Sequence, residues 1–149
     1  MVRHLAGIAE IVDDIDSAIR FYRDVLNLSV QEIEPGYAVV SMPGIVHFGI
    51  WLRKHAATII YKDAAAADRI PLGFTLGLEV DSVDAATERL GSGGSTVVQP
   101  PHNEPWGQRT ARFRSPSGAL CEVSETPAAR RIAHNVAAQG DDGDRAADV

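Results

Sequence analysis

The chain has 149 residues and a mass of 16.0 kDa, the size of one domain or of two half-size modules that share a core. Its 14 Lys and Arg residues against 20 Asp and Glu residues give a formal charge of −6, which argues against a nucleic-acid-binding protein. The single cysteine, Cys121, excludes an internal disulfide framework and fits a reducing cytoplasm. No apolar run approaches the roughly 20 residues that cross a membrane. We therefore expect a cytoplasmic protein with neither nucleic acid nor membrane as a partner.

An internal repeat organises most of the chain. Residues 12–18 read VDDIDSA and residues 80–86 read VDSVDAA, an offset of 68 residues. Each copy follows an apolar, strand-like run and opens a helix that an Asp or Ser side chain can cap. Three short strand candidates, separated by turns rich in Pro and Gly, follow each helix. The predicted strands are 5–12, 28–34, 37–41 and 45–53 in the first half, and 72–80, 95–99, 109–114 and 119–124 in the second.

The repeat predicts an α+β fold in which two βαβββ modules stand in tandem within one domain, residues 1–126. Each module buries its apolar face against the other, because neither could bury that face alone. Module one covers about 4–53, a linker or short helix about 54–71, and module two about 72–125. The composition changes after Pro127. Residues 127–149 are predicted to form a C-terminal helix followed by an acidic, solvated tail.

Three stretches give the chain a family resemblance. They are Val12–Leu28 with its FYRDVL segment, the PWGQR segment at 105–109, and the SPSG turn at 115–118 that leads to Glu122. Together with the paired modules they resemble the vicinal oxygen chelate superfamily, which contains glyoxalase I, methylmalonyl-CoA epimerase, extradiol dioxygenases and the fosfomycin and bleomycin resistance proteins. The resemblance implies a curved sheet, a half-barrel around a shared cavity, and a homodimer. It does not imply one function, because this fold hosts many.

The resemblance also implies where a metal would bind, on the first and last strands of each module. The aligned positions are Gly7, Phe48, Thr75 and Glu122, and of these only Glu122 is a usual ligand for a divalent ion. A shift of one residue in the fourth strand would exchange Phe48 for His47. We therefore expect no cofactor and no metal; a divalent ion, if one binds, would use Glu122 with His47 as the further candidate ligand.

Aromatic residues suggest a binding site. The segment 102–106 follows two prolines and presents His102 and Trp106 on a predicted loop, where binding residues tend to lie. Trp106 and Trp51 could stack on a planar ligand, or they could serve ordinary core or dimer packing. We take Trp106, Trp51 and His102 as candidate ligand-binding residues.

Charged residues on the predicted strands are open to two interpretations. Glu122 could be the counter-ion of a cationic ligand or a general base, or it could form an ion pair with Arg112. His47 could contact a ligand or be a hydrogen-bonded core residue. Arg112 and Arg114 share one face of their strand, which is interpreted as solvated. We add Glu122 and His47 to the candidate ligand-binding residues.

These observations lead to two hypotheses for function. The first is a metal-free protein, similar to the bleomycin resistance proteins, that sequesters an aromatic or cationic small molecule and so confers antibiotic resistance. The alternative is a metal-dependent enzyme, a lyase, epimerase or dioxygenase, that uses Glu122 and non-standard ligands. Whether the protein catalyses a reaction stays open, and an interaction module without a ligand is a third possibility.

Overall fold

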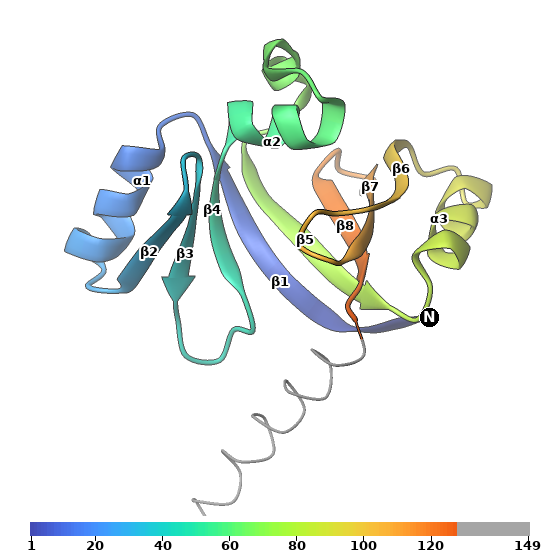
Figure 1. Ribbon diagram of the computed structural model, residues 1–149, viewed down its shortest axis with the longest axis horizontal. Helices are drawn as coiled ribbons and strands as arrows, with labels where there is room; N and C mark the ends of the chain where they lie inside the picture. The colour runs from blue at the N-terminus through green and yellow to red at the C-terminus, as the bar shows by residue number, and fades with distance from the viewer. Residues whose placement is uncertain (128–149) are drawn as a thin grey trace, which may run out of the picture.

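One curved, eight-stranded sheet with the order β2-β3-β4-β1-β5-β8-β7-β6 forms the body of the computed structural model, which describes residues 1–127 (Figure 1). Its two halves are joined where β1 pairs antiparallel with β5. Within each half the first strand pairs parallel with the last, β1 with β4 and β5 with β8. The predicted α+β fold of two βαβββ modules is confirmed. The strands are β1 (Val2–Val12), β2 (Ser29–Glu34), β3 (Tyr37–Ser41), β4 (Phe48–Leu52), β5 (Gly73–Val80), β6 (Val97–Asn103), β7 (Arg109–Arg114) and β8 (Leu120–Glu125).

One helix in each module covers the outer face of the sheet. Asp14 caps α1 (Ile15–Arg20) by accepting a hydrogen bond from the Ser17 N–H at 3.0 Å, and Ser82 caps α3 (Val83–Ser92) in the same way. A π-helical turn, η1 (Phe21–Val25), extends α1. These caps satisfy N–H groups that a helix leaves free at its first turn, as the Asp and Ser residues of the repeat predict.

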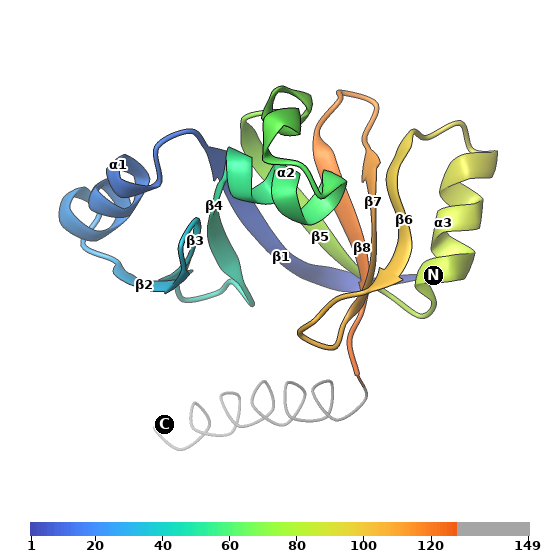
Figure 2. The same cartoon turned by 45° about the horizontal axis from the view of Figure 1, so that its top comes forward.

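The segment between the modules is helical and closes one end of the sheet's inner face (Figure 2). It consists of α2 (Arg53–Tyr61) and a 3₁₀ helix, η2 (Ala64–Arg69). Ala56, Ala57 and Ile60 of α2 pack against Ile11 of β1 and Leu120 of β8. Because these strands belong to different modules, α2 helps to hold the two modules together beside the cavity.

Most strands differ from their predicted bounds by one to four residues, and two of these differences concern the cavity. β4 begins at Phe48 rather than at residue 45, and β6 continues to Asn103 rather than ending at 99. β6 accommodates Pro100 and Pro101 because it is the edge strand, where a missing N–H need not be paired. His102 therefore lies on a strand and not on a loop.

No helix in the described part of the chain is long and apolar enough to cross a membrane. The predicted C-terminal helix and acidic tail fall almost wholly outside the described residues.

Candidate functional site

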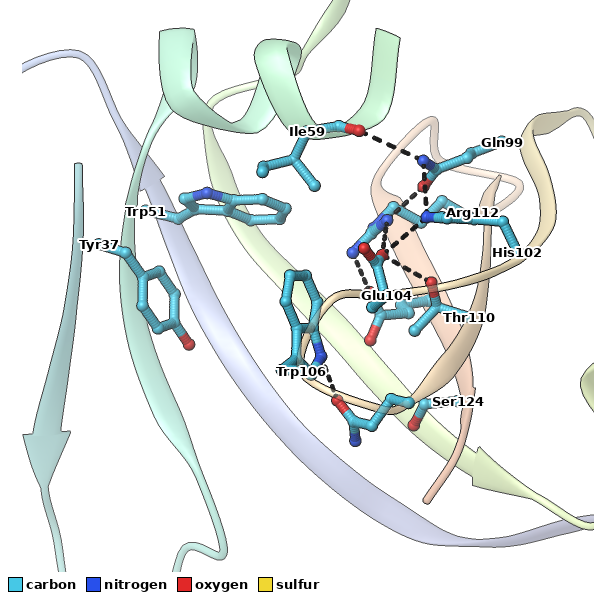
Figure 3. A network of polar contacts seen from close by, with 12 residues as sticks. Tyr37, Trp51, Ile59, Gln99, His102, Glu104, Trp106, Thr110, Arg112 and Ser124 are labelled. Carbon is cyan, nitrogen blue, oxygen red and sulfur yellow. Dashed lines mark hydrogen bonds and ion pairs between the residues drawn. The ribbon is translucent and has the colours of Figure 1, made fainter. Parts of the chain in front are cut away.

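A cavity of about 530 Å³ lies on the inner, concave face of the sheet, between the two modules. Trp51 of β4 and Tyr37 of β3 line it from module one, and Glu122 of β8 and Arg112 of β7 line it from module two. Trp106, on the loop between β6 and β7, lies between these two walls (Figure 3). Both modules therefore contribute side chains to one site, as expected if the duplication built it.

Two tryptophans and a tyrosine form the aromatic surface of the cavity. The indole N–H of Trp51 donates to Nδ1 of His55 at 3.0 Å, and the ring meets Tyr37 edge to face at a centroid distance of 6.3 Å. The indole N–H of Trp106 donates to Oε1 of Gln108 at 2.8 Å, and 41% of this residue is exposed. An exposed tryptophan with its polar atom already paired offers an aromatic face to a ligand.

The loop that carries Trp106 is anchored by Glu104. The Glu104 N–H donates to the Gln108 carbonyl at 2.7 Å, and the Gly107 N–H donates to the Glu104 carbonyl at 2.9 Å. Gly107 has φ of 91°, which a residue with a side chain rarely adopts. The Glu104 side chain turns inward and accepts from the Thr110 hydroxyl at 2.8 Å. Trp106 is thus held on a turn fixed at its base.

Arg112 is the centre of a buried polar network at one side of the cavity (Figure 3). Its guanidinium lies 2.9 Å from Oε1 of Glu104 and 2.6 Å from Oε2 of Glu122, and it also donates to Gln99. Its Cζ lies 5.7 Å from the centre of the Trp51 ring. Only 3% of Arg112 is exposed, so the interpretation of this strand face as solvated was wrong for Arg112. The two carboxylates compensate the cost of burying its charge.

The two carboxylates of this network differ in their ionisation. Burial disfavours the charge of Glu104, but Arg112, Thr110 and the neighbouring His102 outweigh it and lower the pKa of Glu104. Burial also disfavours the charge of Glu122, and there the opposing effect of Arg112 is too small, so the pKa of Glu122 is raised. Glu104 is therefore the more readily ionised of the two carboxylates.

A tyrosine and a histidine stand on the module-one wall. Oη of Tyr37 lies 2.5 Å from Nε2 of His47, and the two rings are nearly parallel. Burial, with smaller contributions from the Glu122 and Glu34 charges, raises the pKa of Tyr37 to about 12. Desolvation by the surrounding protein lowers the pKa of His47. Both side chains are therefore uncharged at neutral pH.

Most of the candidate residues from the sequence are brought together. Trp51, Trp106, His47 and Glu122 line the cavity. His102 does not; it lies behind the wall, where its Nε2 is 3.1 Å from Oε1 of Glu104.

Several residues of the candidate site were not predicted from the sequence. They include Tyr37, Glu104, Gln108 and His55. Glu104 could have been predicted as a site residue, because it is a charged residue in the segment 102–106, which the sequence already indicates as a binding loop. Tyr37 gave no comparable signal, since a tyrosine at the start of a strand is ordinary.

The strand register corrects one of the aligned metal positions. Ile8 pairs with Phe48, and Leu76 pairs with Cys121. Since Ile8 and Leu76 are equivalent in the repeat, Phe48 corresponds to Cys121. Gly49, not Phe48, is therefore the counterpart of Glu122. Phe48 is buried on the outer face of the sheet in the cluster beneath α1.

The residues present do not fit a metal of the kind the resemblance implies. A methyl group on Gly7 would lie 2.9 Å from the His47 carbonyl oxygen, and one on Gly49 would lie 2.6 Å from Oη of Tyr37, so neither position has room for a ligating side chain. The Thr75 hydroxyl is directed to the Ala9 carbonyl at 3.4 Å. Among residues 1–127, no group of three or more His, Cys, Asp or Glu side chains is placed to hold an ion.

The comparisons with known proteins agree with this architecture. The family model of the Glyoxalase/Bleomycin resistance protein/Dioxygenase superfamily matches residues 4–123. The chain belongs to this superfamily. No curated protein matches it.

Solved structures share the fold at low sequence identity. A superfamily member from Vibrio splendidus 12B01 has a TM-score of 0.59 and 14% identity, covering 84% of this chain and 99% of its own. Methylmalonyl-CoA epimerase from Mycobacterium tuberculosis has a TM-score of 0.58 and 23% identity, covering 88% and 93%. A structure described as NAD-dependent benzaldehyde dehydrogenase from Legionella pneumophila has a TM-score of 0.58 and 19% identity. The match covers 80% of this chain and 97% of that one. At these identities the likeness concerns the fold alone.

Proposed function

We propose that the protein binds a small planar cation in the cavity between its modules, without a metal. The observation that carries the proposal is the combination of Trp51 and Trp106 with Glu122 in a single cavity. Aromatic faces bind planar groups, and they attract cations through the negative charge on the ring face. Sequestration of such a compound, including a cationic antibiotic, is the function that we favour.

The charges around the cavity favour a cation over an anion. Arg112 is already paired with both Glu104 and Glu122, so its single positive charge is shared between two carboxylates. Glu34 adds a further carboxylate at the module-one rim. Within the described residues, Glu122 uses only Oε2 in its contact with Arg112. Its other oxygen can accept a hydrogen bond from a cationic group or lie beside its charge.

Calorimetric titration of chelator-treated protein with 1-methylquinolinium tests the proposal. Quinoline, which is neutral at pH 7 and has nearly the same shape, is the matched ligand control. We expect saturable binding of the cation and at least about tenfold weaker binding of quinoline, which corresponds to about 1.4 kcal/mol. Equal affinities for the two compounds would show that the carboxylates do not favour a cation over a neutral ligand. If neither compound binds, the proposal is overturned.

Glu122→Gln should weaken cation binding while leaving the fold intact. Gln keeps the shape and can still accept from Arg112, but it removes the charge. We expect about tenfold weaker binding of 1-methylquinolinium at pH 7 and little change for quinoline. In the unmodified protein, cation affinity should increase as pH rises through the elevated pKa of Glu122, because the carboxylate becomes charged over that range. In the variant this part of the pH dependence should disappear; its persistence would assign the effect to another group.

The alternative, a metal-dependent enzyme, has a separate test. It requires Glu122 and a non-standard ligand such as His47 to hold a divalent ion. The close surroundings of Gly7 and Gly49 disfavour the usual set of metal ligands at those positions. Metal analysis of protein purified without chelator decides between the two. A stoichiometric ion that is lost in Glu122→Ala would favour the enzyme.

We also propose that the protein is a cytoplasmic homodimer. Proteins of this fold are often dimeric, and the outer face of the sheet here carries exposed apolar side chains. Phe74 is 56% exposed and continues an aromatic row through Phe48 and Tyr22 to the half-exposed Phe21. Phe74→Glu should shift the mass in light scattering from dimer to monomer, because it would place a charge in an apolar contact. An unchanged dimer would move the interface elsewhere.

A further inference from the structure

The two modules carry different residues at a pair of equivalent positions in the cavity wall. Glu122 of β8 faces Arg112 of the neighbouring β7, while its counterpart in β4 is Gly49. The two modules therefore present different chemistry to the same cavity. Module two presents a carboxylate, and module one has no side chain at the equivalent place.

The hydroxyl of Tyr37 occupies the space left by Gly49. A Cβ at position 49 would lie 2.6 Å from Oη of Tyr37 and 3.0 Å from two of its ring carbons. The distance to the hydroxyl is shorter than real Cβ contacts, so the glycine is what allows the phenol to lie across β4. Tyr37 pairs with Trp51 in the sheet, and its hydroxyl reaches His47 on the segment before β4.

The Tyr37–His47 pair has hydrogen-bonding capacity left over. A phenol has one donor and two acceptor positions, and a neutral imidazole has one of each. Their mutual contact uses one donor and one acceptor. If the phenol donates to Nε2, its oxygen can still accept; if Nε2 carries the proton, the phenol O–H is free to donate. The pair can adapt to either kind of neutral partner.

The pair is unsuited to an ion. Both side chains are uncharged at neutral pH, so neither offers a counter-charge. An anionic group would also face the Glu122 and Glu34 charges, which act on Tyr37. A carboxamide, a ketone or a hydroxyl group is the chemistry that remains.

Resting on the proposed function, we infer that Tyr37 and His47 form a second polar subsite, across the cavity from Glu122, for a neutral hydrogen-bonding group of the ligand. The ligand class is thereby narrowed to planar cations that carry a carboxamide, carbonyl or hydroxyl group on the side away from the charge. Figure 3 shows the Tyr37 hydroxyl on the wall opposite the Arg112 network, with Trp51 and Trp106 beside the space between them.

The test compares 1-methylquinolinium with a series of its derivatives that carry one carboxamide at each ring position in turn. Calorimetry gives the affinity ratio of each derivative to the parent. We expect at least one derivative to bind about five- to tenfold more tightly, the size of one neutral hydrogen bond. In Tyr37→Phe, which keeps the ring, this ratio should fall to about one. Gly49→Ala should lower the ratio as well, because its methyl group displaces the hydroxyl.

Tyr61→Phe is the matched control, since Tyr61 lies outside the cavity and stacks on Arg69. It should leave the ratio unchanged. A gain that survives in Tyr37→Phe overturns the inference. The inference is also overturned if 1-methylquinolinium binds but none of its carboxamide derivatives binds more tightly. That result would leave the proposed function intact. If neither the parent nor any derivative binds, the proposed function fails and the inference fails with it.

Discussion

Replacing Arg112 by methionine is expected to lower the free energy of unfolding by about 3–5 kcal/mol, the usual cost of removing one partner from a buried ion pair. The side chain is 3% exposed, and its removal leaves Glu104, with 1% of its side chain exposed, without its guanidinium. Methionine fills much of the same volume, so the loss reports the uncompensated charge rather than a void. Urea denaturation followed by circular dichroism measures it.

Two further variants show whether this effect comes from the charge of Glu104. The double variant Arg112→Met with Glu104→Gln should recover a large part of the loss, because the buried anion is gone. Arg23→Met removes an exposed arginine paired with Asp24 and should change stability by less than about 1 kcal/mol. If the double variant is as unstable as Arg112→Met alone, lost packing and not charge is the cause.

The pH dependence of this loss follows from the pKa of Glu104. The folded-state pKa is lowered, so the stability from its charged form is present above the unfolded-state value and is lost as pH falls through the folded-state value. In Arg112→Met burial acts without its opposing charge, so that pKa should be raised. The difference between variant and unmodified protein should therefore shrink in mild acid, where the variant's carboxyl takes up a proton.

Replacing Trp106 by alanine is expected to weaken binding of 1-methylquinolinium by about 2 kcal/mol, or about 30-fold, while stability changes little. The ring is 41% exposed, and its hydrogen bond goes to Gln108 on the same loop, so the fold depends little on it. The turn is held by Glu104 and Gly107, which the substitution leaves in place. Calorimetric titration and urea denaturation measure the two effects separately.

Trp106→Phe provides the graded control. It keeps an aromatic face of smaller area and should lose less affinity than Trp106→Ala. A ligand that binds Trp106→Ala as tightly as the unmodified protein would show that this residue is an exposed loop side chain with no part in the site. A large loss of stability in Trp106→Ala would assign it a packing role instead.

Much of the fold was predictable because its signals are local. The capping residues Asp14 and Ser82 open their helices as the repeat suggests. These depend on residues a few positions apart, and the repeat shows each signal twice. Pairing of two such modules follows because each has an apolar face to bury.

The site was predicted less completely because its contacts are distant in the chain. Arg112 is buried only because Gln99, Glu104 and Glu122 converge on it from β6, the following loop and β8. A lone arginine in a strand gives no sign of such partners. The register error at Phe48 has another cause: the turn from Gly44 into β4 is one residue longer than the turn from Gly118 to the matching point of β8. An alignment that places the ligand position four residues after each turn glycine therefore selects Phe48, which lies on the outer face of the sheet.

The chain contains two tryptophans, and both border the cavity. Its intrinsic fluorescence is consequently a report on this one place. The two emitters are also distinguishable, because Trp51 lies partly buried with its N–H on His55, whereas Trp106 is more exposed and bonded to an amide. Trp51→Phe and Trp106→Phe would give single-emitter proteins without any introduced dye. The change in emission of each tryptophan would then report separately on a ligand bound in the cavity. The same signal would give the rate at which the ligand enters.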